Sequence, residues 1–113
     1  MKLYLTLQAY VEVADLTEAL EEAKALVALV EPLAAIADCH VSRYWKIPEQ
    51  HGVWLKFSVE DAHATYRTIL AVLAADWDLH GGVDDKWAVW NAHLNGPSPL
   101  KSARWLHLEM LPE

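Results

Sequence analysis

Hydrophobic and polar residues alternate at every second position near the start of the chain, over residues 2–13. Because successive side chains of a strand point to opposite faces of a sheet, this alternation predicts a half-buried strand. Four later segments are also predicted strands, at residues 40–47, 52–59, 86–94 and 103–110. Pro48 and Gly52 are expected to mark the turn between the first two of these, and the GPSP sequence at 96–99 the hairpin between the last two.

Two segments have the three-to-four-residue spacing of apolar positions that is typical of an amphipathic helix. The first spans residues 16–34, with Asp15 as a suitable N-cap. Pro32 is expected to kink or divide this helix, because an interior proline removes a backbone hydrogen bond and clashes with the preceding turn. The second spans residues 62–73 and can open at Asp61.

These elements follow one another in the order βαββαββ. Two strand–helix–strand units side by side give an antiparallel sheet with both helices on one face, which is the ferredoxin-like arrangement with one strand more. The 113 residues are enough for one packed core, so we expect a single α+β domain over residues 1–113.

This arrangement leaves one face of the sheet without helices. Trp105, His107 and Glu109 occupy alternate positions of the last strand and therefore share that face. The candidate binding residues assigned to it are Tyr4, Tyr10, Tyr44, Trp54, Trp105, His107 and Glu109. The same face is expected to hold Gln8, Lys46 and Lys56, together with one of Trp87 and Trp90.

The predicted aromatic face is large enough to suggest binding. One aromatic side chain offers ~150–250 Å², whereas the largest apolar patch on a typical monomer is about 300–600 Å². Tyrosine and tryptophan are also frequent in binding hot spots. The face could instead be covered in either of two ways: the 76–86 segment or the C-terminal tail folds over it, or two copies of the chain cover each other as a homodimer.

The net charge of −7 indicates which class of macromolecule the protein binds. Nucleic acid is disfavoured, because phosphate binding needs a basic surface, and a basic protein is favoured.

No apolar run is long enough to cross a bilayer, and no signal-peptide core opens the chain. The lone Cys39 excludes an internal disulfide and is expected to be a buried thiol. We therefore expect a soluble cytoplasmic protein without membrane partners.

Side chains that could carry chemistry are present, but their spacing is not that of a metal or catalytic site. Asp76, Asp78 and His80 alternate before two glycines, which is more typical of an acidic turn than of an ion site. Other candidate pairs are Glu60 with His63 and His93 with His107. No zinc-type spacing, nucleophile motif or phosphate-binding glycine loop occurs, so we expect no cofactor, no metal and no catalytic residue.

An enzyme remains the main alternative. Dimeric α/β barrel proteins, among them cofactor-independent monooxygenases, have this element order and pair sheet against sheet around a cavity. Trp54, Asn91 and His107 would be the candidate residues of such a site. A small-ligand-binding protein, or a regulatory ligand-binding module of the ferredoxin-like type, also agrees with the pattern.

Three segments, RYWKIPE (43–49), DKWAVWN (85–91) and ARWLHLEM (103–110), resemble sequences among small bacterial immunity proteins of polymorphic or contact-dependent toxin systems. The resemblance implies a cytoplasmic protein that binds and neutralises one cognate toxin, often an enzyme domain with a basic surface. It carries over no single contact residue, because such families diverge at their binding surfaces. We therefore expect a non-enzymatic protein that occludes a toxin domain.

Overall fold

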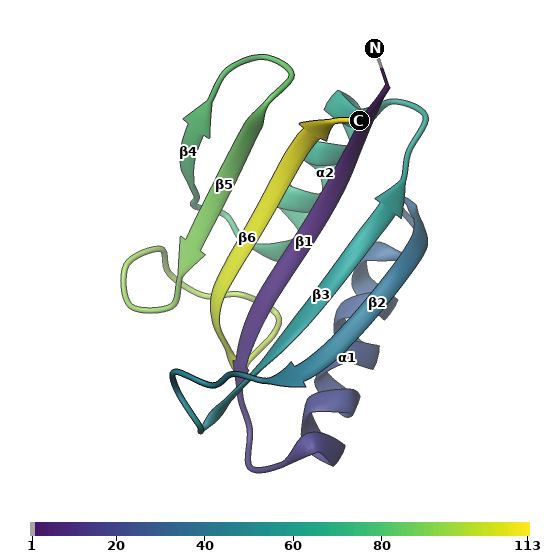
Figure 1. Ribbon diagram of the computed structural model, residues 1–113. Helices are drawn as coiled ribbons and strands as arrows, with labels where there is room; N and C mark the ends of the chain where they lie inside the picture. Colours follow the sequence, from purple (N-terminus) through teal and green to yellow (C-terminus); the bar gives the residue numbers. More distant parts are fainter. Residues whose placement is uncertain (1) are drawn as a thin grey trace.

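The computed structural model describes residues 2–113 and contains six strands and two helices. In chain order these are β1 (Leu3–Glu12), α1 (Leu16–Val30), β2 (Ala35–Arg43), β3 (Gln50–Ser58), α2 (Ala62–Leu73), β4 (Asp78–Gly81), β5 (Lys86–Asn91) and β6 (Ala103–Pro112). The strands form one antiparallel sheet in the order β2-β3-β1-β6-β5-β4, and both helices lie on the same face of it (Figure 1). α1 packs on β2 and β3, and α2 packs on β1 and β6.

The α+β class, with an antiparallel sheet and two helices, is confirmed. The predicted ferredoxin-like βαββαββ order is wrong, because the chain follows the order βαββαβββ. The additional strand, β4, begins at Asp78 in the segment that we predicted to be an acidic turn. All of its residues are exposed, so it has no alternation of buried and polar positions to mark it in the sequence. Its pairing with β5 holds it in the sheet.

The first connection from helix to strand is also earlier than predicted. α1 ends at Val30, so that Pro32 follows the helix instead of kinking it. β2 then spans Ala35–Arg43 in place of the predicted 40–47. The alanine-rich residues at the start of β2 fit a helical pattern as well as an extended one, and this explains the error.

Side-chain caps begin both helices where the sequence places them. The Asp15 carboxylate accepts a hydrogen bond from the Glu18 N–H at 2.9 Å, and the Glu18 carboxylate accepts one from the Ala14 N–H at 2.9 Å. Asp15 is thus the predicted N-cap, and it satisfies a backbone donor that the first turn leaves free. Glu18 bonds the residue before the cap, so the pair differs by one residue from a regular capping box. In α2 the Asp61 carboxylate accepts a hydrogen bond from the Ala64 N–H at 3.1 Å.

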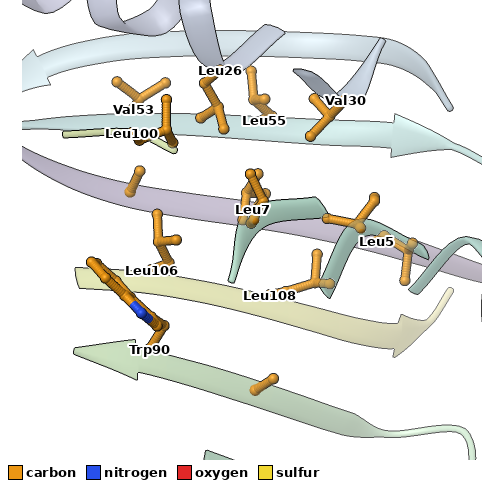
Figure 2. Close-up of a cluster of buried hydrophobic side chains, with 14 of the residues drawn as sticks. Leu5, Leu7, Leu26, Val30, Val53, Leu55, Trp90, Leu100, Leu106 and Leu108 are labelled. Carbon is orange, nitrogen blue, oxygen red and sulfur yellow. The ribbon is translucent and has the colours of Figure 1, made fainter. Parts of the chain in front are cut away.

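The hydrophobic core lies between the helices and the sheet. Leu26 and Val30 of α1 point onto the sheet, where Leu7 and Leu108 lie on its central strands β1 and β6 (Figure 2). Trp90 is the largest fully buried side chain and belongs to this core. Burying a leucine or valine side chain in this core contributes about 1.5–3 kcal/mol to stability. The core thereby holds in place the strands whose other side forms the helix-free face of the sheet. Over residues 2–113, neither helix has the length and apolar character needed to cross a bilayer.

Candidate functional site

The face of the sheet that points away from the helices, hereafter the open face, carries the candidate residues. On β1 the residues Leu5, Leu7 and Ala9 are fully buried, whereas the residues between them are half-buried. The phases predicted for the first and last strands are therefore correct. The structure places Tyr4 and Tyr10 on β1, Trp54 on β3, Trp105, His107 and Glu109 on β6, and Tyr44 directly after β2.

Four rings on the open face stack in succession, and we name Tyr44, Tyr10, Trp105 and His107 the aromatic ladder. Tyr44 and Tyr10 have ring centroids 4.3 Å apart and an interplanar angle of 10°. Tyr10 and Trp105 follow at 5.0 Å and 26°, and Trp105 and His107 at 5.4 Å and 9°. Each such aromatic pair is worth about 0.5–1.5 kcal/mol beyond its buried area, so the stacking contacts favour this arrangement of the four rings.

A glycine makes the ladder continuous across β3. Gly52 lies within β3, opposite Tyr10 of β1 and Ser42 of β2, and not in the turn where we predicted it. A Cβ built on Gly52 would lie 3.3 Å from Tyr10 Cε1. The missing side chain therefore leaves the space through which Tyr10 reaches Tyr44 beyond the neighbouring strand.

Partial burial shifts the pKa values of two side chains of the ladder, Tyr10 and His107. Burial raises the pKa of the Tyr10 phenol, and the nearby Tyr44 phenol raises it further, so the Tyr10 hydroxyl remains protonated at neutral pH. Gln8 Nε2 donates a hydrogen bond to the Tyr10 oxygen at 3.3 Å. Burial lowers the pKa of His107, although the Glu109 carboxylate opposes this shift. The His107 ring is thus neutral at pH 7 and offers one donor and one acceptor.

Other rings extend the open face toward both edges of the sheet. The rings of His40 and Trp54 lie 5.3 Å apart, and those of His80 and Trp87 lie 5.6 Å apart. Trp87 is therefore the tryptophan of β5 that joins the open face. The sequence pattern did not assign His40 or His80 to the open face, because it placed His40 as the first residue of a strand that in fact begins at Ala35, and because it did not identify β4.

Lys56 and Lys46, both expected beside the rings, have different positions. Lys56 Nζ lies 4.7 Å from the ring centroid of Tyr4, close enough for a cation–π contact on the open face. Lys46 lies in the loop after β2, where its Nζ is 5.3 Å from the ring centroid of Trp45.

A depression of about 670 Å³ lies beside the ladder, lined by Tyr10, Tyr44, Trp105 and Asn91 among others. Arg104 also lines it, because a register shift between Tyr10 and Val11 gives β6 one extra residue at this point.

At the border of the depression Arg104 forms an ion pair. Its Nη2 lies 2.9 Å from the Glu12 carboxylate, and its Nε donates to the same oxygen at 3.0 Å. Nη1 is hydrogen-bonded to the carbonyls of Lys101 and Ala103. The guanidinium therefore positions the two strands and has little capacity left for an anionic ligand.

The candidate enzyme residues share the open face without converging on one point. Trp54 and His107 flank Gln8 on its two sides, while Asn91 lies opposite Trp105. In residues 2–113 no group of three or more histidine, cysteine, aspartate or glutamate side chains is placed to hold a metal ion.

The other chemically versatile residues have their own partners or positions. Asp76 accepts a hydrogen bond from Asn95 Nδ2 at 3.1 Å. His63 Nε2 lies 3.1 Å from the Asp84 carboxylate, which ties α2 to the turn between β4 and β5. Cys39 is exposed, contrary to our prediction, because it lies on an edge strand.

Comparisons of the chain with protein family models, curated proteins and solved structures found no match.

Proposed function

We propose that the chain is a non-enzymatic binding protein whose open face docks on a partner protein, and that it acts as an immunity protein by occluding a cognate bacterial toxin domain. The single observation that supports this most is the aromatic ladder on a sheet face that no helix covers. The resemblance of three segments to small bacterial immunity proteins supports the more specific part of the proposal.

The orientation of the rings favours a protein over a sugar or a nucleobase. Tyr10 is stacked between Tyr44 and Trp105, so its ring faces are already in contact with other rings. Recognition of bases by stacking needs a free ring face. Stacked rings instead present their edges and polar tips, which suits packing against the mixed surface of a protein.

Charge supports a basic partner. The chain has a net charge of −7, and α1 with its C-cap carries four exposed or half-exposed acids, Glu18, Glu21, Glu22 and Glu31. Such a field increases the rate of encounter with a basic domain. On the open face itself Lys56 and Glu109 provide both signs of charge, so that these residues orient the partner and the rings supply the contact area.

The proposal predicts that a toxin domain is encoded beside the gene for this chain, and that domain is the partner used in the test. Wild-type protein is expected to restore growth of cells that express the domain and to bind it tightly in titration calorimetry. Trp105→Ala is expected to weaken binding by ~2 kcal/mol, about a 30-fold rise in the dissociation constant, as at a hot spot. Thr68→Ala, an exposed residue of α2 on the other side of the molecule, is the control and is expected to change nothing.

Two results would contradict the proposal. One is that the neighbouring genes encode no toxin, or that wild-type protein neither binds the domain nor protects cells from it. The other is that Trp105→Ala and Thr68→Ala bind equally well, which would place the contact outside the open face.

The depression beside the ladder supports one second candidate, a dimeric α/β barrel enzyme or small-ligand-binding protein. Its volume of about 670 Å³ lies within the range of ligand pockets. In that case two open faces would close over Trp54, Asn91 and His107. Sedimentation at micromolar concentration distinguishes the candidates, because the barrel requires a stable dimer whereas the binding protein is expected to be a monomer.

A further inference from the structure

A hollow of about 430 Å³ lies where the start of α1 meets the sheet, at the end where β2 finishes and β3 begins (Figure 1). Asp15 and Leu16 line it from the start of α1, Val41 and Arg43 from β2, and His51 from β3. Its volume is within the range of small-molecule pockets. Because α1 forms one wall, the hollow is on the helix side of the sheet and is separate from the open face.

His51 is a buried polar side chain beside this hollow. It is 5% exposed, and its Nδ1 is enclosed without a hydrogen-bond partner among residues 2–113. Nε2 is not enclosed, so it is the nitrogen that a molecule in the hollow can reach. Buried polar groups in native proteins nearly always have a partner. An imidazole with no partner, whose accessible nitrogen borders a hollow, therefore indicates a polar ligand.

The start of α1 supplies backbone donors to the same hollow. The first N–H groups of a helix have no intrahelical acceptor, and with the helix dipole they attract a negatively charged group. The Asp15 carboxylate accepts the Glu18 N–H through Oδ1, and the Asp15 carbonyl accepts the Ala19 N–H. The N–H groups of Leu16 and Thr17 have no such acceptor in residues 2–113, so they remain for a ligand.

Arg43 adds a positive charge. It lies directly opposite His51 on the neighbouring strand, so both side chains are on the helix side of the sheet. Arg43 Nε donates to the Pro48 carbonyl at 3.3 Å. Within residues 2–113 it forms no ion pair, in contrast to Arg104, which is bound to Glu12. The terminal nitrogens of Arg43 are therefore available to a carboxylate.

Asp15 makes a zwitterion a better ligand than a simple anion. Its carboxylate borders the hollow and would repel a phosphate, but its Oδ2 is free to accept a hydrogen bond from an ammonium group. Arg43 and Asp15 thus offer opposite charges to one molecule. Leu16, which is 52% exposed, and Val41 add apolar surface to the wall.

We propose that the hollow binds an α-amino acid with a small aliphatic side chain. The carboxylate of the amino acid pairs with Arg43 and with the free N–H groups at the start of α1, and its ammonium group pairs with Asp15. His51 Nε2 hydrogen-bonds with this polar end, while Leu16 and Val41 contact the aliphatic side chain. The inference goes beyond the proposed function, because it assigns a small-molecule site away from the face that docks the partner.

Titration calorimetry with L-leucine and two related molecules tests the pattern of charge. Isocaproate is leucine without the ammonium group, and isoamylamine is leucine without the carboxylate, while both keep the aliphatic part. L-Leucine is expected to bind at least about tenfold more tightly than either, because each of them lacks one charged hydrogen-bonding group.

Two variants at helix N-caps test the role of Asp15. Asp15→Asn removes the charge and keeps the cap, since asparagine and aspartate cap helices about equally well. It is expected to weaken binding of L-leucine about tenfold and to leave binding of isocaproate unchanged or stronger. Asp61→Asn makes the same change at the N-cap of α2, outside the hollow, and is expected to bind L-leucine as the wild type does.

Arg43→Gln tests the carboxylate contact and is expected to weaken binding of L-leucine about tenfold. Arg67→Gln, at an exposed position of α2, is the matched control. NMR spectra identify where the ligand binds. L-Leucine is expected to shift the imidazole signals of His51 and the amide signals of Leu16 and Thr17.

Three results would overturn the inference: no heat and no shifted signals with L-leucine, binding of L-leucine no tighter than that of isocaproate or isoamylamine, or equal affinities in Arg43→Gln and Arg67→Gln. The second would mean that the hollow does not recognise both charges, and the third that the ligand binds elsewhere. Trp105→Ala is expected to retain amino acid binding, because Trp105 is on the open face. A failure of toxin binding and a failure of amino acid binding are therefore separate results.

Discussion

The ring of Tyr10 lies beside the backbone of Gly52, its cross-strand neighbour, so closely that a Cβ on Gly52 would come within 3.3 Å of Tyr10 Cε1. The contact has the form of an aromatic ring covering a glycine on the adjacent strand, which compensates for the missing side chain. It also decides where the ring points. With Gly52 beneath it, Tyr10 extends toward Tyr44, and the aromatic ladder spans β3 although β3 contributes no ring to it.

Gly52→Ala is expected to disturb the ladder while hardly changing stability. The new methyl group displaces Tyr10, which costs up to about 1 kcal/mol of aromatic contact. Replacing the glycine also reduces the conformational entropy of the unfolded chain, which stabilises the fold by about 0.4–1 kcal/mol and offsets this loss. Near-ultraviolet circular dichroism is expected to lose intensity from the coupled rings. Ser42→Ala, at the neighbouring position on β2, is the control. An unchanged near-ultraviolet spectrum in Gly52→Ala would show that Tyr10 does not depend on the glycine.

Trp90 and Trp105 lie on opposite faces of the sheet and should respond differently to truncation. Trp90 is 2% exposed, so Trp90→Ala leaves a cavity in the core and is expected to lower the free energy of unfolding by about 3–5 kcal/mol. Trp105→Ala removes two stacking contacts at a half-buried position and should cost only about 1–2 kcal/mol. Guanidinium denaturation of both variants measures the difference. Equal losses would mean that Trp105 belongs to a core.

His107 should make the stability of the protein depend on pH below about 6.5, the ordinary pKa of histidine. Burial lowers its pKa in the folded state, so the unfolded chain binds the proton more readily. Stability is therefore fully present above the unfolded pKa and is lost as the pH falls through the folded pKa. His107→Gln is expected to give a flatter curve of unfolding free energy against pH between about 7 and 5.

Glu109 provides a second test of the same group. Its carboxylate opposes the effect of burial on His107, so Glu109→Gln should lower the pKa of His107 further, which an NMR titration of the imidazole would show directly. A pKa that rises in this variant, or a curve for His107→Gln as steep as that of the wild type, would contradict the assignment.

Asn95 should be a structural residue that joins two loops. Its side chain is 6% exposed. Oδ1 accepts a hydrogen bond from the Asn91 N–H at 2.8 Å, and Nδ2 donates one to the Asp76 carboxylate at 3.1 Å. Asn95→Leu leaves the Asn91 donor without this partner and is expected to cost about 1–3 kcal/mol in thermal or chemical unfolding.

Asn95→Asp separates the two bonds. It keeps the acceptor for Asn91 but places a negative charge against Asp76, so the variant should be less stable at neutral pH and recover as acid protonates the carboxylates. Recovery at low pH in Asn95→Asp but not in Asn95→Leu is the expected result. If neither variant were destabilised, Asn95 would not hold these loops together.

The sequence predicts best the elements in which every second residue is buried. β1, β3 and β6 each have an apolar side against the helices, and the caps at Asp15 and Asp61 define where the helices begin. Periodicity does not identify β4, since no face of it is buried. It also misplaces the start of β2, because that edge strand is mostly exposed and its alanines suit a helix equally well.

The contents of the open face were predictable, but the contacts on it were not. Alternation along β6 places Trp105, His107 and Glu109 together without knowledge of any other strand. The stacking of Tyr10 on Trp105 depends on the register between the first and last strands, which no local pattern specifies. The role of Gly52 depends in the same way on its position opposite Tyr10, since a glycine near a proline favours a turn when only the neighbouring residues are considered.

The order of the strands has a consequence for how the protein is made. β6 is the last strand of the chain, yet it lies between β1 and β5 and is the only link between the β4–β5 hairpin and the rest of the sheet. A nascent polypeptide without residues 103–112 therefore has β1 open along one side and the hairpin without a neighbour. Before residues 103–112 are added, the unpaired side of β1 and the lone hairpin are free to pair with other chains. β6 removes both of these free edges by joining the hairpin to β1, which leaves β2 and β4 as the edges of the sheet.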